Sequence, residues 1–274
     1  MEQEGFGPGK RRRRCCFIVS VLAVLLLIVI LALALGLSMR EETNELEPIF
    51  LSRCKQLKEY DCQQAWELFQ QAYVNRDPCN VSMEAYDPFI TATAIRPQCN
   101  RMMFWSKTKY VVHEFTEKKN CFQTLEDTVL GSVLDGLTWC GKEGSFETFS
   151  SGCPAWMDCA NNPVRSFWNR ASAAFADVAC GNVTAMLNGS IATPFDSSSI
   201  FASIEVKNFK SSKVKNLDIV LITQKNFVTN CTNQSLQTLK TQLPEGIIYN
   251  CKEVPETQIK QCSGDSEKAC GACW

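Results

Sequence analysis

The stretch LDIVLIT at residues 217–223 decides the fold, because it is almost wholly apolar and rich in β-branched side chains. A short run of this kind is typical of a strand that is buried on both faces of a parallel sheet. A second such run is GIIYNCKEV at 246–254, and NQSLQTLKTQL at 233–243 between them has helical spacing. The order strand, helix, strand predicts a small parallel sheet.

Two further apolar runs extend this prediction toward the N-terminus. We expect strands at RMMFWSK (101–107) and at SIFASIEV (199–206). Apolar residues at spacings of three and four instead predict helices. These helices are expected at CQQAWELFQQAYVN (62–75), TKYVVHEFTEK (108–118) and NNPVRSFWNRASAAFADVACGNVTAML (161–187).

The predicted architecture combines α+β and α/β character in two lobes. Helices dominate the first lobe, and the second contains the parallel sheet with flanking helices. The first would comprise residues 49–98 and 124–179, and the second residues 99–123 and 180–274. A cleft between the lobes is the default ligand site.

The N-terminal segment predicts a membrane anchor. KRRRR at 10–14 precedes an uncharged apolar run at 17–37, which at about 1.5 Å per residue spans a bilayer core of roughly 30 Å. A cleaved signal peptide is the competing interpretation, but its apolar region is usually only about 7–15 residues long. We expect a cytoplasmic tail (1–16), a transmembrane helix (17–37) and a stalk (38–48). The basic cluster then predicts a single-pass type II protein of the plasma membrane, with its C-terminal part outside the cell.

Cysteines and sequons agree with an extracellular location. Of the 16 cysteines, all but Cys15 and Cys16 lie beyond the apolar run, as in a disulfide-bonded domain of an oxidising compartment. N-x-S/T sequons suit a glycoprotein; they occur at Asn80, Asn182, Asn188, Asn230 and Asn233. The net charge of −1 supplies no basic field that would attract nucleic acid.

Several kinds of chemistry are excluded by the residues present. His113 is the one histidine, and H-E-x-x-H, G-x-S-x-G and the glycine-rich phosphate loops are absent. We therefore expect no metal centre, and we expect His113 to be an ordinary helix residue. The CGAC sequence at 270–273 is more typical of structural disulfides than of a redox motif in this compartment.

Acids among apolar residues are the features that remain. TLEDTVLGSVLDGLTWCGK at 124–142 places Glu126, Asp127 and Asp135 among side chains typical of a core, and Glu205 lies within ASIEV. Carboxylates are costly to ionise in such surroundings unless something pairs with them. Glu126 and Asp135 would point to opposite sides of one continuous helix, so they share a cleft only if the chain turns at a glycine between or beside them.

Three motifs taken together resemble one enzyme family. TLEDTVLGSVLDGLTWCG, DCANNPVRSFW and FASIEV, in this order behind an N-terminal anchor, are similar to the ADP-ribosyl cyclase/cyclic ADP-ribose hydrolase family. The resemblance extends from about Cys54 to Cys270 and is strongest for the branch with a type II membrane anchor.

The resemblance implies an ectoenzyme that cleaves the nicotinamide–ribose bond of NAD. The implied products are ADP-ribose and cyclic ADP-ribose, which is linked to calcium signalling, with hydrolysis of cyclic ADP-ribose and base exchange as further reactions. NAD is then the substrate, and no cofactor is implied. Oligomeric state, including a homodimer, stays open.

The resemblance also assigns roles to residues. Glu205 matches the catalytic glutamate, which stabilises or captures the ribosyl cation after nicotinamide leaves. Trp168 matches the tryptophan that stacks on the substrate, and Ser172 matches a serine near the reacting ribose. The implied substrate-binding residues are Trp105, Glu126, Asp135, Ser106, Lys107 and Phe201.

Among the binding residues, Trp105 is implied to face Trp168 across the pocket. Glu126 and Asp135 would hold the carboxamide of nicotinamide, and Glu126 would also bias the outcome between hydrolysis and cyclisation. The implied diphosphate contacts come from Ser106, Lys107 and Phe201.

The resemblance further implies a disulfide framework. The implied pairs are Cys54–Cys62, Cys79–Cys159, Cys99–Cys180, Cys140–Cys153, Cys231–Cys251 and Cys262–Cys270. Cys121 and Cys273 are left over, and a seventh bridge, free thiols and a link between two chains all stay open.

Two rival functions remain. One is a cell-surface adhesion receptor that keeps the fold without catalysis. The other is a glycosidase, which would need a general acid about 5–10 Å from its nucleophile. Substituting Glu126 distinguishes a glycosidase from an NAD-cleaving enzyme. The ratio of cyclase to hydrolase activity, glycan occupancy and cytosolic partners are not decided by the sequence.

Overall fold

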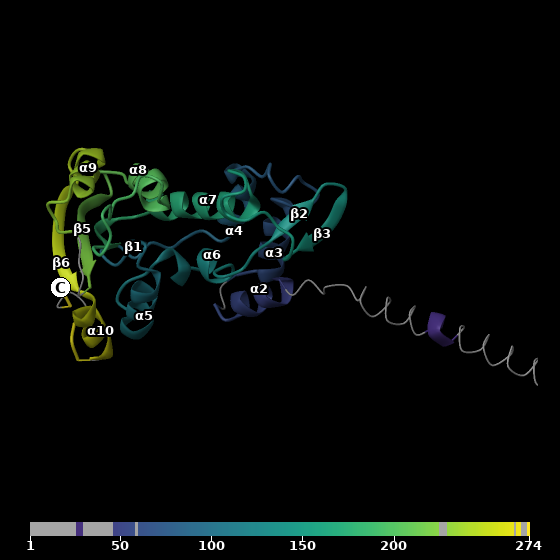
Figure 1. The fold of residues 1–274 in the computed structure, drawn as a ribbon, viewed down its shortest axis with the longest axis horizontal. Coiled ribbons are helices and arrows are strands. Elements are labelled where there is room, and N and C mark those ends of the chain that lie inside the picture. The colour runs from purple at the N-terminus through teal and green to yellow at the C-terminus, as the bar shows by residue number, and fades with distance from the viewer. Residues whose placement is uncertain (1–25, 30–45, 58–59, 225–228, 266, 270–272) are drawn as a thin grey trace, which may run out of the picture. The chain divides into compact units, whose positions relative to one another are not determined.

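The computed structural model describes residues 26–29, 46–57, 60–224, 229–265, 267–269 and 273–274 (Figure 1). Residues 46–274 group into one compact unit. Its helices are α2 (Leu46–Lys55), α3 (Cys62–Gln71), α4 (Asp87–Ala92), α5 (Lys109–Lys119), α6 (Val129–Ser132), α7 (Pro163–Asp177), α8 (Val206–Asn208), α9 (Gln234–Gln242) and α10 (Glu256–Gly264). Its strands are β1 (Met103–Ser106), β2 (Cys140–Lys142), β3 (Ser145–Phe149), β4 (Gly181–Asn188), β5 (Val214–Thr223) and β6 (Ile248–Pro255).

The predicted tail and most of the predicted transmembrane helix lie outside the described residues. Of positions 17–37, only residues 26–29 are described, and they are helical. No helix within the described part of the chain is long and apolar enough to cross a bilayer. Helix α2 begins at Leu46, inside the segment expected to be the stalk, because Leu46 and Phe50 are buried in the core.

A four-stranded parallel sheet has the order β1-β4-β5-β6. The strands predicted within 101–107, 217–223 and 246–254 are confirmed, and so is the crossover helix α9 between the last two. In the register, Trp105 of β1 lies opposite Met186 of β4, and Ala185 lies opposite Ile219 of β5. The predicted parallel sheet is therefore present.

Both faces of the sheet are buried at β5, as its apolar run predicts, whereas the expectation of burial on both faces is wrong for β6, an edge strand whose residues are mostly exposed or partly buried. Leu217, Ile219 and Leu221 belong to the larger core, which also contains residues of α7 and α9. Val220 and Ile222 alternate with them and pack into a second cluster with residues of α5 and α10. This period of two follows from the alternation of side chains along a strand. Helix α7 extends the larger core from the sheet to α3 and α4 (Figure 1).

Helix α7 begins where the sequence predicts, at Pro163 after the Asn162 cap, whose side chain accepts a hydrogen bond from the Arg165 amide. The prediction that this helix continues to residue 187 is wrong. It ends at Asp177, and Gly181–Asn188 form β4. Alanine, methionine and leucine favour helices, but β4 is hydrogen-bonded on both sides within the sheet, and this pairing overrides a weak propensity.

The prediction of a strand at residues 199–206 is also wrong. Phe201–Glu205 form a π-helical turn that continues into α8 and packs against α7. A short apolar run cannot be assigned to a strand or a helix from periodicity alone. Ser199 favours the helical outcome locally, because its carbonyl accepts from the Ser203 amide and its hydroxyl accepts from the Ala202 amide.

The chain does turn between Glu126 and Asp135, as the sequence requires. Leu125–Asp127 form a 3-10 turn, α6 follows, and Gly136 adopts a left-handed φ of 75°. Gly131 has a different role. A Cβ at this position would lie 2.3 Å from the carbonyl oxygen of Leu125, so α6 packs directly on the backbone next to Glu126.

The disulfides confirm five of the six implied pairs. These are Cys54–Cys62, Cys79–Cys159, Cys99–Cys180, Cys140–Cys153 and Cys231–Cys251.

The implied Cys262–Cys270 pair is wrong, because Cys262 is bonded to Cys273. Cys273 is buried beside α10 in the second core cluster, and Gln258 donates a hydrogen bond to its carbonyl. Cys121 is disulfide-bonded as well, so it is not a free thiol.

The close packing of α6 generates a prediction. Gly131→Ala should lower the free energy of unfolding by about 1–3 kcal/mol, because the new methyl group overlaps the Leu125 backbone and one of the two segments must move. Denaturant unfolding of the full-length chain measures this. Gly264→Ala is the matched control, since an added Cβ there meets no atom of another described segment within 4 Å. Equal stability of the two variants would contradict the packing argument.

Candidate active site

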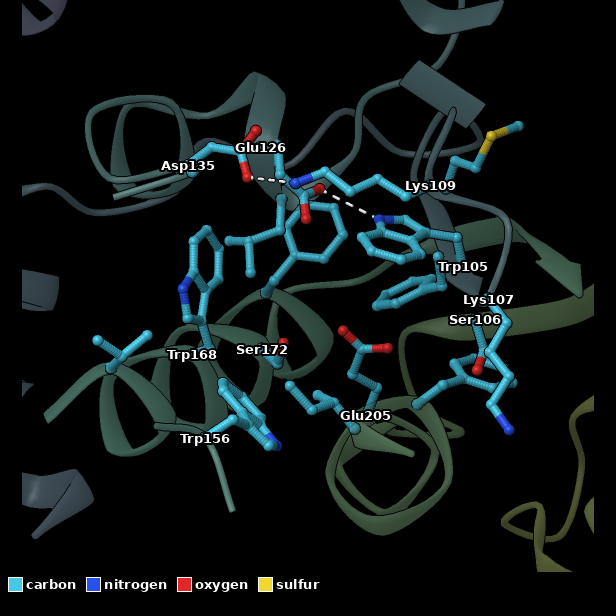
Figure 2. Close-up of a pocket in the computed structure, with 18 of the residues that line it drawn as sticks. Trp105, Ser106, Lys107, Lys109, Glu126, Asp135, Trp156, Trp168, Ser172 and Glu205 are labelled. Carbon is cyan, nitrogen blue, oxygen red and sulfur yellow. Dashed lines mark hydrogen bonds and ion pairs between the residues drawn. The ribbon is translucent and has the colours of Figure 1, made fainter. Parts of the chain in front are cut away.

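A cavity of about 490 Å³ opens at the carboxyl end of β1. Its wall is formed by β1, the start of α5, the segment around residues 125–138, α7 and the π-helical turn (Figure 2). The carboxyl ends of parallel strands are where ligands bind in many α/β proteins. All of the residues that the resemblance singles out line this cavity, namely Trp105, Ser106, Lys107, Glu126, Asp135, Trp168, Ser172, Phe201 and Glu205.

Glu205 is the buried acid of this cavity. The π-helical turn ends on it, and its carboxylate points into the space between Trp105 and Trp168 in Figure 2. The pKa of Glu205 is raised to about 8, chiefly by burial; a hydrogen bond with Ser172 opposes this rise, and the charge of Glu126 adds to it. A wide turn that interrupts a helix is frequent at functional sites.

Helix α7 supplies two neighbouring residues of the wall. Trp168 and Ser172 are four positions apart, so they lie one above the other on the same helix face. The Ser172 hydroxyl reaches Glu205, while the Trp168 ring packs edge-on against Phe167 at a centroid distance of 5.1 Å. The helix therefore fixes a stacking surface beside the buried acid.

The adjacent acids Glu126 and Asp127 have different roles. The Asp127 carboxylate accepts hydrogen bonds from the backbone amide and hydroxyl of Thr124, which caps the 3-10 turn. Glu126 instead faces the cavity, and its Oε2 accepts a hydrogen bond of 3.2 Å from Trp105 Nε1. One acid is used to build the turn, and the other is left available to a ligand.

Asp135 lies in the same wall and is held from two sides. Lys109 Nζ makes an ion pair of 2.8 Å with the Asp135 carboxylate. Arg53 of α2 donates to the backbone carbonyls of Asp135 and Ser132 at 2.7 and 3.3 Å. Sequence reasoning missed Lys109, because its partner is 26 residues away and the pair leaves no local pattern.

Tryptophans fall into two groups. Trp139 is fully buried and donates to the Tyr86 hydroxyl at 3.0 Å, so it is a core residue. Trp105, Trp168 and Trp156 line the cavity. Trp156 was missed by the sequence reasoning; it is 39% exposed, and the Arg165 guanidinium lies 5.9 Å from its ring centroid.

Lys107 sits at the rim in a left-handed conformation with φ of 58°. Asn188 donates to its carbonyl at 3.2 Å, and its ammonium forms an ion pair of 2.7 Å with Asp196. The hydrogen bond from Lys107, followed by those from Ser198, lowers the pKa of Asp196 well below its usual range. In Figure 2 the Lys107 ammonium points away from Glu205.

No group of three or more His, Cys, Asp or Glu side chains within the described residues is arranged to hold a metal ion. The arrangement instead offers one buried carboxylate, two aromatic walls and two further acids around a space large enough for a small molecule.

Comparison with known sequences gives consistent matches. A model of the ADP-ribosyl cyclase family matches residues 43–271. ADP-ribosyl cyclase/cyclic ADP-ribose hydrolase 1 of Rattus norvegicus is 35% identical over 223 residues, which cover 77% of this chain and 74% of the rat protein. The protein named ADP-ribosyl cyclase/cyclic ADP-ribose hydrolase of Aplysia californica is 28% identical over 243 residues, which cover 83% of this chain and 86% of the Aplysia protein.

Solved structures with the same fold agree. Porcine CD38 complexed with a covalent intermediate, ribo-F-ribose-5′-phosphate, matches with a TM-score of 0.73 and 35% identity, covering 78% of this chain and 97% of that one. Aplysia cyclase complexed with the substrate NGD and the product cGDPR matches with a TM-score of 0.74 and 27% identity. The match covers 85% of this chain and 97% of the cyclase chain.

The raised pKa of Glu205 predicts a pH-dependent stability. Between the ordinary value of 4.5 and about 8, the unfolded chain has lost the Glu205 proton while the folded chain keeps it. Folding stability then falls as pH rises through this window. Glu205→Gln should therefore be more stable than the parent, with a gain that grows by up to about 1 kcal/mol per pH unit from pH 5 to pH 8.

Thermal unfolding at pH 5, 6.5 and 8 measures this gain. Glu143→Gln removes an exposed glutamate from the β2–β3 turn and should show no such gain. If Glu205→Gln and the parent differ by the same amount at every pH, Glu205 is not a buried acid of raised pKa.

Proposed function

This chain belongs to the ADP-ribosyl cyclase family, and on that premise we propose that it is an NAD glycohydrolase and ADP-ribosyl cyclase. It cleaves the nicotinamide–ribose bond of NAD and gives ADP-ribose and cyclic ADP-ribose. It also hydrolyses cyclic ADP-ribose and exchanges the base. The observation that carries this proposal is one buried carboxylate, Glu205, facing a cavity with a tryptophan on either side.

The chemistry of NAD suits this arrangement. Nicotinamide in NAD is cationic, so it leaves as a neutral molecule and needs no general acid. Breaking its bond to ribose leaves an oxocarbenium-like cation, as in glycoside cleavage. A single carboxylate in a cavity of low polarity stabilises such a charge strongly. Glu205 is placed for this role, either as an electrostatic partner or as the nucleophile of a covalent ribosyl intermediate.

Substrate binding itself would ionise Glu205. In the free protein, burial favours the protonated acid. A cation that enters the cavity favours the carboxylate, because opposite charges at short range lower the pKa of an acid. The negative charge then develops where the positive substrate lies, and Ser172 stabilises it through its hydrogen bond.

The other wall residues would orient the substrate. The faces of Trp105 and Trp168 can stack on the pyridinium ring, and each cation–π contact contributes about 0.5–2 kcal/mol. Glu126 and Asp135 can accept hydrogen bonds from the carboxamide group. The remaining contacts, to the diphosphate, fall to Ser106, Lys107 and Phe201, which also line the cavity.

The products depend on which nucleophile reaches the ribosyl cation. Water gives ADP-ribose, the adenine of the same molecule gives cyclic ADP-ribose, and a free pyridine base gives base exchange. The structures of related proteins support this proposal, since porcine CD38 was solved with a covalent intermediate and Aplysia cyclase with a substrate and a cyclic product.

We place this activity outside the cell. The apolar run at residues 17–37 and the basic residues before it support a type II membrane anchor with residues 1–16 in the cytosol. The disulfides support an oxidising compartment. Of the sequons, Asn80, Asn182 and Asn230 are exposed and offer positions for glycans, while Asn188 and Asn233 are partly buried.

A substitution at Glu126 separates this proposal from a glycosidase. Incubating the full-length parent with NAD should release nicotinamide together with ADP-ribose and cyclic ADP-ribose. Glu126→Gln should retain nicotinamide release within about tenfold, because one hydrogen bond to a charged group is worth roughly that factor, and it should change the product ratio. Chromatography of the nucleotide products measures both quantities.

An essential general acid at Glu126 would give the opposite result, namely complete loss of bond cleavage. A folded parent that releases no nicotinamide would instead favour the adhesion receptor.

A further inference from the structure

Helix α5 presents two donor side chains, one turn apart, to the two acids of the cavity wall. Lys109 and His113 are four positions apart and therefore lie on the same helix face. Lys109 makes its ion pair with Asp135. One turn further on, His113 Nε2 lies 3.9 Å from Glu126 Oε2. The helix thus faces each acid with a group that can donate a hydrogen bond to it.

The His113 imidazole is unusual because its Nε2 atom is buried without a partner. Within the described residues, no acceptor completes a hydrogen bond to this nitrogen. Buried polar atoms in native proteins are nearly always hydrogen-bonded, so each exception requires an explanation. The acid that Nε2 faces, Glu126, has a side chain only 10% exposed. The unpaired Nε2 of His113 and the Oε2 of Glu126 are therefore only slightly farther apart than a hydrogen bond allows.

Trp105 links the two groups. Its ring meets the His113 ring edge-on, at a centroid distance of 5.8 Å and an angle of 78°. Its Nε1 donates to the same Oε2 atom of Glu126 that His113 faces. Both potential donors thus converge on one oxygen. No hydrogen bond within the described part of the chain uses the other oxygen, Oε1.

From this geometry we propose that His113 is a positioning residue for the NAD reaction, which holds Glu126 through Oε2 so that Oε1 accepts from the carboxamide of nicotinamide. Imidazole donates from Nε2 in one neutral tautomer and in the protonated form, so a small approach of the two side chains completes the bond. Two donors on one oxygen fix the rotation of the carboxylate. A carboxylate held in this way is an oriented acceptor before the ligand arrives, which lowers the entropy cost of binding.

This proposal rests on the proposed function and specifies one of its parts. It predicts that His113 acts on the nicotinamide end of the substrate and on the product ratio, because both depend on the orientation of Glu126. Among the described residues, no hydrogen bond, ion pair or ring contact joins His113 to Glu205 or Ser172, so cleavage itself should depend on it less.

Three variants and one control test the proposal in the full-length chain. In His113→Gln, the side-chain amide can place a donor near the position of Nε2. His113→Leu keeps the volume and removes the donor, and in His113→Asn the amide is too short to reach Oε2. Glu117→Gln is the control, since Glu117 is an exposed residue of the same helix outside the cavity. Inhibition by free nicotinamide, kcat and KM for NAD and the ratio of ADP-ribose to cyclic ADP-ribose are measured for each.

His113→Leu and His113→Asn should weaken nicotinamide inhibition about tenfold and change the product ratio, as expected for losing one hydrogen bond that orients a charged group. His113→Gln and Glu117→Gln should stay within about twofold of the parent. Unchanged inhibition in His113→Leu would overturn the proposal. So would an equal loss in His113→Gln and His113→Leu, because the imidazole would then serve packing alone. Absence of nicotinamide release by the parent would refute the proposed function instead.

Discussion

The burial of one carboxylate is the constraint on which the rest of the site depends. An acid in an aromatic cavity disfavours its own ionisation, and the raised pKa of Glu205 expresses this cost. The residues around Glu205 suit a ligand that offsets this cost. A cation in the cavity removes the penalty, so the site is most complementary to a positively charged species. A nicotinamide dinucleotide carries such a charge at the bond to be broken, and the oxocarbenium-like state carries it at ribose.

Several elements are needed to hold this acid in place. The π-helical turn, Phe201–Glu205, packs against α7, which supplies Ser172 and Trp168 from one face. The end of β1 supplies Trp105 opposite them, and α5 follows β1 directly, pairs Lys109 with Asp135 and faces Glu126 with His113. Parallel strands deliver these segments to one edge of the sheet. The chemistry therefore depends on the sheet and on α7 together, which share one continuous core.

Sequence alone predicted the parts that depend on local pattern. Short runs rich in β-branched residues identified β5 and β6, and the Asn162–Pro163 pair identified the start of α7. Where tertiary pairing overrides propensity, the sequence pattern predicts the wrong element: it predicts a helix at β4 and a strand at the turn bearing Glu205. Motif resemblance identified the wall residues that surround Glu205. It could not identify Lys109 or His113, because each faces an acid that is distant in the sequence, Asp135 or Glu126, and such a pairing leaves no local pattern.

The measurement that tests the central claim most directly is NAD cleavage by Glu205→Gln beside the parent, with nicotinamide release followed at saturating NAD. Glutamine preserves the shape of the side chain and removes the charge. The account predicts a folded variant, with its disulfides intact, whose kcat is at least about a thousandfold lower, comparable to the loss of a key electrostatic group in other enzymes. A folded variant that retains more than about a tenth of the parental rate would contradict the assignment of Glu205 as the group that stabilises the ribosyl cation.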